Sequence, residues 1–190
     1  LNAHGWRLDS ADASLRTQAP VAAASDRAEA LGVQDLVILA VKAQALPALA
    51  PQLAPLIGPD TVVLTMMNGV PWWFLQGFGG DHAGRPLEAV DPGGTIARAV
   101  PAEHVLGCVV HASCALHGPG HVRHHFGDGL IVGEPAGGSS PRVEALVALL
   151  QSAGFSATVS AQIQKDVWYK LWGNMTVNPI SAMTGATTDK

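Results

Sequence analysis

The sequence predicts an α/β fold in which a sheet with parallel strands is followed by a helical segment. Six consecutive apolar residues, Leu36 to Val41, are typical of a strand buried on both faces of a parallel sheet. A second apolar stretch, Thr61 to Met66, follows a crossover with leucines at helical spacing. Strand, crossover and strand form a βαβ unit, which is right-handed and parallel in nearly all proteins. A further segment with helical spacing, Gln164 to Asn178, follows the sheet.

Composition sets limits on the class of protein. The 190 residues are 48% hydrophobic and 14% charged, with a mean hydropathy of +0.23, as in an ordered globular protein. A net charge of −4 and a pI near 6.0 predict that neither nucleic acid nor an anionic membrane is a partner. There is no apolar run of 18 residues, and the two cysteines fit a reducing compartment, so we expect a cytoplasmic protein.

The first third of the chain predicts small elements around the βαβ unit. Two short apolar runs, Trp6 to Leu8 and Pro20 to Ala24, suit edge strands or a hairpin that precedes the main sheet. In the crossover, prolines interrupt the helical spacing of the leucines, which predicts two short turns rather than one helix. The leucines are Leu46, Leu49, Leu53 and Leu56, and the prolines are Pro51 and Pro55.

The middle of the chain predicts more strands and one regular helix. Residues 105–126 read as two strands joined by a turn at His117 to Gly120, and Gly129 to Gly133 reads as a third, so this half should be antiparallel or mixed. Ser140 before Pro141 marks a helix N-terminus, and the helix should end near Gly154.

Domain boundaries follow from the last elements. Ala157 to Val159 should return to the sheet as a final strand, which puts the boundary near Ala161. We therefore expect an incomplete α/β domain at residues 1–161 and the first helix of an incomplete helical domain at residues 162–190. Because the chain opens on Leu1 and closes at Lys190 just after a helix, we expect an internal piece of a longer protein.

A tryptophan- and glycine-rich segment, residues 71–91, should form a loop over the carboxyl edge of the sheet. Trp72 and Trp73 would act as a lid or partner surface if exposed, whereas under the loop they would be packing, which the usual burial of tryptophan favours.

The residues best suited to catalysis or substrate binding lie on the last helix. Lys170, Asn174 and Asn178 are spaced at i, i+4 and i+8, so they form a file over about 80° of a helix surface. A lysine ammonium can donate a proton or stabilise an alkoxide, and the amides can bind a small polar substrate. The alternative is a half-buried helix with a solvated polar stripe, although asparagine is a poor residue for a helix interior.

Two further features belong to this helix. Trp168, Trp172 and Met175 lie opposite the polar file and should seat the helix against the body of the protein. Pro179 should force Asn178 out of the α region, so that the file ends at a helix break.

Polar residues also follow both strands of the βαβ unit. Lys42 comes after the first strand and Asn68 after the second, so both should lie at the edge where open α/β sheets bind ligands. Each alone is commonplace, as an exposed lysine and an Asn-Gly turn, but together with the Lys170 file they favour a binding site.

A metal site is the weaker interpretation of the histidines and cysteines between residues 108 and 125. His111, Cys114 and His117 have the spacing of zinc ligands, but strand alternation sends His111 and Cys114 to opposite faces. We therefore expect no metal. No nucleophile elbow and no paired carboxylates support a hydrolase.

Several strings in the sequence resemble one known family. VILAVKAQ and LTMMNGV, which carry Lys42 and Asn68, and VWYKLWGNMTVNPISAMTGAT, which carries the Lys170 file, are similar to segments of the ketopantoate reductases (2-dehydropantoate 2-reductases). The resemblance runs from about Asp35 onward and includes residues 91–135.

This resemblance implies a Rossmann-like dinucleotide-binding domain, truncated at its N-terminus, and the start of an all-α domain like that of 6-phosphogluconate dehydrogenase. It implies NADPH-dependent reduction of 2-dehydropantoate to (R)-pantoate. Lys170 would be the proton donor, Asn174, Asn178 and Asn68 would bind substrate, and Lys42 and Asn68 would hold the cofactor. The expected partners are a 2-oxo acid and, at most, a second copy of the chain in a homodimer.

Two parts of the family pattern do not occur in this sequence: the G-x-G-x-x-G turn, and the residue that selects NADPH over NADH. We therefore expect this stretch alone to be inactive. Two alternatives stay open. One is a related reductase of another 2-oxo acid or an imine, and the other is a non-catalytic module that binds a partner through residues 71–91.

Overall fold

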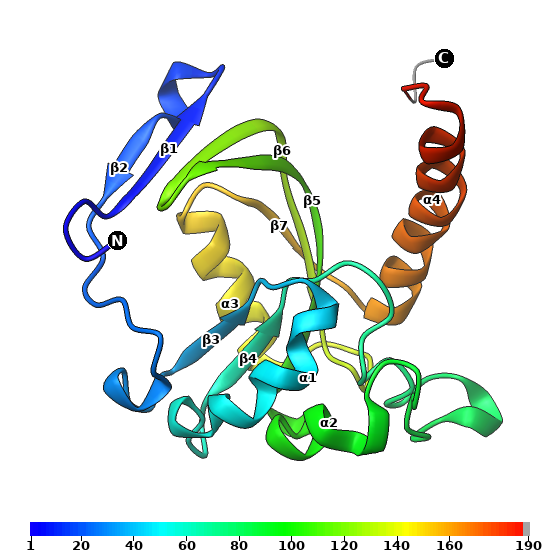
Figure 1. Ribbon diagram of the computed structural model, residues 1–190. Coiled ribbons are helices and arrows are strands. Elements are labelled where there is room, and N and C mark those ends of the chain that lie inside the picture. Colours follow the sequence, from blue (N-terminus) through cyan, green and yellow to red (C-terminus); the bar gives the residue numbers. More distant parts are fainter. Residues whose placement is uncertain (188–190) are drawn as a thin grey trace.

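Apolar runs of the sequence become the strands of a seven-stranded mixed sheet (Figure 1). The computed structural model describes residues 1–187, and the strand order is β2-β1-β6-β5-β4-β3, with β7 beside β6. The strands are β1 (Trp6–Ser10), β2 (Thr17–Ala19), β3 (Leu36–Leu39), β4 (Val62–Thr65), β5 (Val105–Gly118), β6 (His121–Gly133) and β7 (Ser156–Val159). The α-helices are α1 (Leu46–Leu49), α2 (Thr95–Ala99), α3 (Pro141–Ser152) and α4 (Ile163–Thr184).

The predicted βαβ unit is present. β3 and β4 pair in parallel, with Leu36 opposite Val62. The crossover consists of α1 and a 3-10 segment, Ala50–Leu56, so the two short turns expected from the prolines are confirmed. β3 is not buried on both faces, however, because Ile38 is 47% exposed. β3 lies at one edge of the sheet, and α3 covers the face that carries Ile38 only as far as Leu36.

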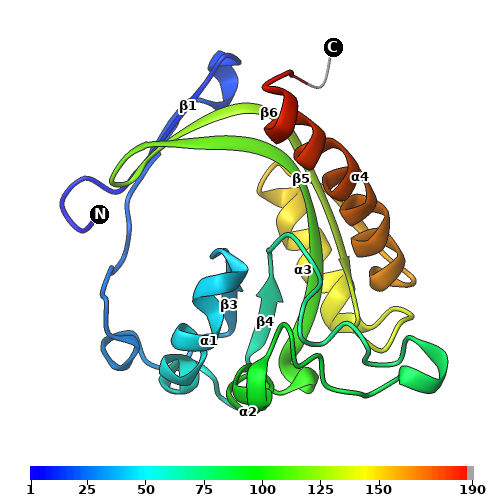
Figure 2. The same ribbon diagram turned by 45° about the vertical axis from the view of Figure 1, so that its right-hand side comes forward.

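The long β5–β6 hairpin curves over the sheet and is its most extended element (Figure 2). The expectation of a separate third strand at Gly129 to Gly133 is wrong, because these residues are the end of β6. Register shifts near His111 and Ser113 let the antiparallel ladder bend without ending, so one strand continues where the glycines suggested two.

The N-terminal hairpin adds an edge to the sheet. β1 pairs antiparallel with β2 and parallel with β6, so of the two expectations the hairpin is confirmed, and β2 is its edge strand. The second strand lies at Thr17–Ala19 and not at Pro20 to Ala24, since Pro20 has no N–H to donate to the ladder.

Both faces of the sheet carry helices. α3 packs on one face over β4, β5, β6 and β7. Its N-terminus is where Ser140 and Pro141 predict it, since Ser140 Oγ accepts a hydrogen bond from the backbone N–H of Val143. α1, α2, the loop of residues 71–91 and the first turns of α4 cover the other face.

The tryptophans of the loop are core residues. Trp73 is 2% exposed, and its Nε1 donates a hydrogen bond to Thr65 Oγ1 at 3.1 Å. Trp72 is also buried. The structure therefore agrees with the packing interpretation of both side chains, and neither is available as a lid.

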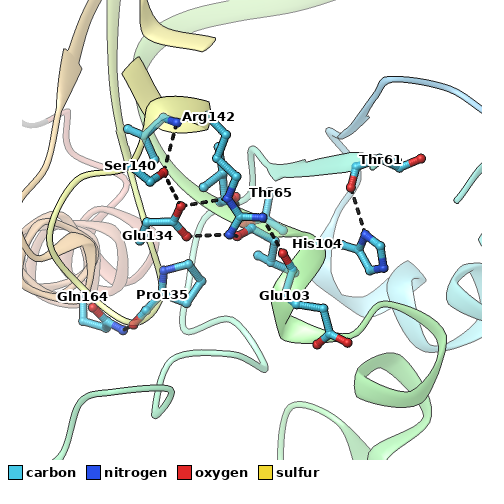
Figure 3. A network of polar contacts seen from close by, with 12 residues as sticks. Thr61, Thr65, Glu103, His104, Glu134, Pro135, Ser140, Arg142 and Gln164 are labelled. Carbon is cyan, nitrogen blue, oxygen red and sulfur yellow. Dashed lines mark hydrogen bonds and ion pairs between the residues drawn. The ribbon is translucent and has the colours of Figure 1, made fainter. Parts of the chain in front are cut away.

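A polar network joins the end of β6 to the starts of α3 and β5 (Figure 3). Arg142 pairs with Glu134 at 2.6 Å and donates to the carbonyl oxygens of Glu103 and Val105. Ser140 donates its hydroxyl proton to Glu134 at 2.6 Å. The guanidinium of Arg142 lowers the pKa of the Glu134 carboxyl.

α4 is seated by its first turns alone and then projects away from the sheet (Figures 1 and 2). Ile163, Gln164 and Val167 are buried. The expectation that Trp168, Trp172 and Met175 seat the helix is wrong for most of this face, because all three are exposed, Trp172 by 67%. Trp168 still touches the body, since its ring centroid lies 6.2 Å from that of the buried Phe74.

The predicted helix break at Pro179 is also wrong. α4 runs through Pro179 to Thr184 and ends at Gly185, whose φ of 66° is the left-handed conformation typical of a helix C-terminus. A proline removes one backbone hydrogen bond, and the turns on either side hold the helix together here. Within residues 1–187, no helix combines the length and apolar character that a membrane span requires.

Candidate functional site

The carboxyl ends of β3 and β4 bring two predicted residues together. Lys42 lies three residues beyond β3 and Asn68 three beyond β4, and both line a cavity of about 300 Å³. Lys42 is exposed, so its ammonium is free to meet an anionic group. The parallel pairing of the strands places them there, as the sequence predicts.

Lys170 lies on α4 beside the same edge of the sheet. It lines a crevice together with Asn68 and Asn174. Its ammonium donates a hydrogen bond to the carbonyl oxygen of Val110 on β5. The side chain is half-buried, and burial lowers the pKa of the ammonium from its ordinary value. A lysine with a lowered pKa gives up its proton more readily near neutral pH.

Cys108 is the titratable group that influences the pKa of Lys170. Its thiol is buried, which raises its pKa to about 12, so it stays a neutral thiol near neutral pH. No carboxylate pairs with Lys170 among residues 1–187. The charge of the ammonium is therefore held by a carbonyl dipole and remains available to an anion.

Asn178 occupies a different position from its neighbours in the file. It is exposed on the part of α4 that has left the sheet, and it does not line the crevice of Lys170. The structure brings together Lys170, Asn174 and Asn68, with Lys42 in the adjoining cavity, and leaves Asn178 two turns away along the helix.

These residues fit a dinucleotide at the end of the sheet. Lys42 offers a cation and Asn68 an amide, and Gly69 follows with a φ of 93°. A Cβ at Gly69 would meet no atom within 4 Å, so the backbone lies against open space where a ligand can approach.

Sequence reasoning did not single out Gln164. This side chain is 0% exposed, and its amide donates to the carbonyl oxygens of Gln76, at 2.9 Å, and Pro135. It thereby fixes the start of α4 to the loop of residues 71–91. A signal was present, because Gln164 stands one turn before Val167 on the apolar side of the helix.

The histidines and cysteines of β5 and β6 do not assemble. No group of three potential ligands lies close enough to hold a metal ion in the part of the chain that the structure describes.

The sheet and its edge define a Rossmann-like α/β protein. The family model described as Ketopantoate reductase PanE/ApbA matches residues 1–72. The 2-dehydropantoate 2-reductase of Mesorhizobium japonicum is 45% identical over 187 residues, which are 98% of this chain and 56% of the relative. The chain is thus similar to ketopantoate reductases over nearly its whole length.

Solved structures agree with this similarity. A protein from Ralstonia solanacearum MolK2, described as a candidate ketopantoate reductase, superimposes with a TM-score of 0.92 at 54% identity, over 98% of this chain and 57% of that one. A D-mandelate dehydrogenase solved with NADH superimposes with a TM-score of 0.62 at 25% identity, over 80% of this chain and 44% of that one. The chain spans 56% of the Mesorhizobium japonicum relative and 57% of the Ralstonia solanacearum structure.

Proposed function

We propose that the intact protein reduces 2-dehydropantoate to (R)-pantoate with NADPH. The observation that carries this proposal is the crevice where Lys170 and Asn174 of α4 meet Asn68 at the end of β4. A proton donor, an amide and the ligand-binding edge of the sheet lie together there. The similarity to a 2-dehydropantoate 2-reductase, at 45% identity, supports the same reaction.

Each residue has a role that its position allows. NADPH, when bound, would supply the hydride. Lys42 and Asn68 hold the cofactor from the ends of β3 and β4. Lys170 donates its proton, or at least its charge, to the carbonyl oxygen of the substrate as that oxygen becomes an alkoxide. Asn174 and Asn178 orient the hydroxyl and carboxylate groups of the substrate.

The exposed face of α4 supports a second domain. We assign residues 1–161 to the dinucleotide-binding domain and residues 162–190 to the start of a helical substrate domain. Trp168, Trp172 and Met183 leave an apolar surface uncovered along α4, which further helices would bury. Such helices would also bring Asn178 into a closed site.

Initial-rate assays on the full-length protein test the function. We expect oxidation of NADPH that depends on 2-dehydropantoate, and weaker oxidation of NADH. No turnover of any 2-oxo acid with either nucleotide would contradict the reductase proposal, and nucleotide titration would then show whether the protein is a module that does not bind a cofactor.

A second candidate is a reductase of another 2-oxo acid, favoured by the match to D-mandelate dehydrogenase with NADH. A panel of 2-oxo acids under the same conditions separates the two. A higher kcat/KM for an acid other than 2-dehydropantoate, or a preference for NADH, would decide for the second candidate.

A further inference from the structure

A polar cavity lies at the edge of the sheet that the N-terminal hairpin forms, opposite to β3 in the strand order (Figure 1). It has a volume of about 360 Å³, far more than the roughly 30 Å³ that one water molecule takes up in the liquid. β1, the turn after it and the tips of β5 and β6 supply its wall. The residues that line it are Arg7, Asp9, Ser10, Ala11, Arg16, His117 and Arg123. Three of the 11 lysines and arginines of the chain therefore meet in one place.

The pairing of β1 with β6 brings these charges together. Arg7 and Asp9 are two residues apart on β1, so their side chains project from the same face of the strand. In the parallel ladder, His121 of β6 lies opposite Arg7, and Arg123 lies opposite Asp9. The register thus sets basic groups from distant parts of the chain beside one carboxylate.

That carboxylate is already in use. Arg7 Nε donates a hydrogen bond to Asp9 Oδ1 at 3.2 Å, and His121 Nε2 lies 2.7 Å from Asp9 Oδ2. The hydrogen bond with His121, and that from Arg7, lower the pKa of the Asp9 carboxyl. Among the described residues that line the cavity, three guanidinium groups face this one carboxylate, which leaves a surplus of two positive charges. Asp12, in the turn after β1, is exposed and does not line the cavity.

Two of the guanidinium groups keep donors available to a ligand. Arg123 has no hydrogen-bond or ion-pair partner among residues 1–187, although it lies opposite Asp9, because Arg7 and His121 take the carboxylate oxygens. Arg16 donates from Nε to the carbonyl oxygen of Ser10 at 2.7 Å, which orients its plane and leaves both terminal nitrogens. Paired N–H donors of this kind match the oxygens of a phosphate group.

We propose that this cavity binds the phosphate group of a small molecule other than the cofactor. A phosphate monoester carries a charge of about −1.5 to −2 near pH 7, which matches the surplus of the wall. Arg123 and Arg16 donate to the phosphate oxygens, and Arg7 adds its charge from beside Asp9.

The site is separate from the proposed reductase centre. Lys42 and Asn68 follow β3 and β4, whereas β5 and β6 lie between β4 and β1 in the sheet. The phosphate site therefore does not depend on the proposed reaction, and each can fail without the other.

Calorimetric titration of the full-length protein, saturated with NADPH in a phosphate-free buffer of low salt near pH 7, tests the binding. The probes are inorganic phosphate and ribose 5-phosphate, and the tighter of the two shows whether the ligand is free phosphate or a monoester. We expect at least one of them to bind. Absence of binding by both would overturn the proposal. Binding that NADPH abolishes would also overturn it, since the phosphate would then occupy the cofactor site.

A pair of arginine variants shows where the phosphate binds. Arg123→Ala should weaken binding by about tenfold or more, because hydrogen bonds between charged groups contribute at least that factor. Arg85→Ala is the matched control, since Arg85 is an exposed arginine of the loop of residues 71–91 that does not line the cavity. Equal weakening in both variants would reduce the effect to overall charge and contradict the site.

A conservative variant and a second measurement guard against a loss of folding. Arg123→Lys keeps the charge without the fork of donors, so its affinity should lie between those of the parent and Arg123→Ala. In thermal unfolding, phosphate should raise the Tm of the parent and of Arg85→Ala, and should leave that of Arg123→Ala unchanged. A rise of equal size in Arg123→Ala would contradict the assignment.

Discussion

The ammonium of Lys170 donates a hydrogen bond to the carbonyl oxygen of Val110, which ties the first turns of α4 to the middle of β5. The contact sets the direction of the lysine side chain before any ligand binds. Because burial lowers the pKa of this ammonium, the same position that orients the group also makes it a better acid.

Removing the ammonium should remove most of the activity. In the full-length protein, we expect Lys170→Ala to lower kcat/KM for 2-dehydropantoate by about 10² or more, since a positioned acid contributes roughly that factor. Lys165→Ala is a matched control, because Lys165 is an exposed lysine of the same helix that lines none of the cavities of the site. A near-normal rate for Lys170→Ala in steady-state assays would exclude the acid role.

The pH dependence of kcat should carry the signature of this lysine. A general acid must be protonated, so the rate should fall as pH rises through the pKa of Lys170. Because that pKa is lowered, the fall should begin at a lower pH than an exposed lysine would give. Lys170→Arg should be slower, since arginine does not give up a proton, and its residual rate should show no fall up to about pH 10.5, because arginine stays charged there. An unchanged alkaline limb in that variant would assign the ionisation to another group.

The Glu134–Arg142 ion pair should make the free energy of unfolding depend on pH in the acidic range. Arg142 lowers the folded-state pKa of Glu134 below its ordinary value of 4.5, so the stabilisation is present above that value and is lost as pH falls through the folded-state pKa. We expect Glu134→Gln to lower the free energy of unfolding at pH 7 by about 1–2 kcal/mol. In urea titrations, the difference in free energy of unfolding between the variant and the parent should disappear at low pH. A difference that does not change with pH would show that Glu134 does not link stability to protonation.

Gly107 should tolerate no side chain. A Cβ there would lie 2.5 Å from Trp73 Cη2 and 2.8 Å from Ile163 Cγ1, and both side chains are buried in the core. Gly107→Ala should therefore destabilise the protein by about 1–3 kcal/mol in thermal or urea unfolding. Gly118→Ala is the control, because a Cβ at Gly118 meets no atom within 4 Å on the same strand. Equal stability of the two variants would mean that the side chains around Gly107 shift to make room for the added methyl group.

Local signals in the sequence were sufficient for the elements that depend on local chemistry. The cap at Ser140 and Pro141 predicts α3, and the prolines of the crossover predict its short turns. The juxtaposition of Lys42 and Asn68 also follows from sequence, because the topology of a βαβ unit allows one arrangement of its strand ends. The chemical roles of these residues stay predictions.

Features that depend on partners far away in the sequence could not be predicted in the same way. The apolar stripe of Trp168 and Trp172 indicates that a surface is to be buried, but periodicity does not tell which body covers it. The continuation of β6 past Gly129 depends on its ladder with β5, and the seat of α4 depends on Gln164, whose partners lie far away in the sequence. Pro179 costs one hydrogen bond, which a helix of 22 residues survives.

The distribution of tryptophans gives this protein two optical probes. Trp72 and Trp73 are buried under the loop, whereas Trp168 and Trp172 on α4, and Trp6 on β1, are exposed to solvent. With Trp6 replaced by phenylalanine, an aqueous quencher such as iodide should therefore quench the red-shifted emission of the helix first and leave the blue-shifted emission of the loop. Whatever covers α4 in the intact protein would protect that red component, so its accessibility measures how the two halves of the molecule come together.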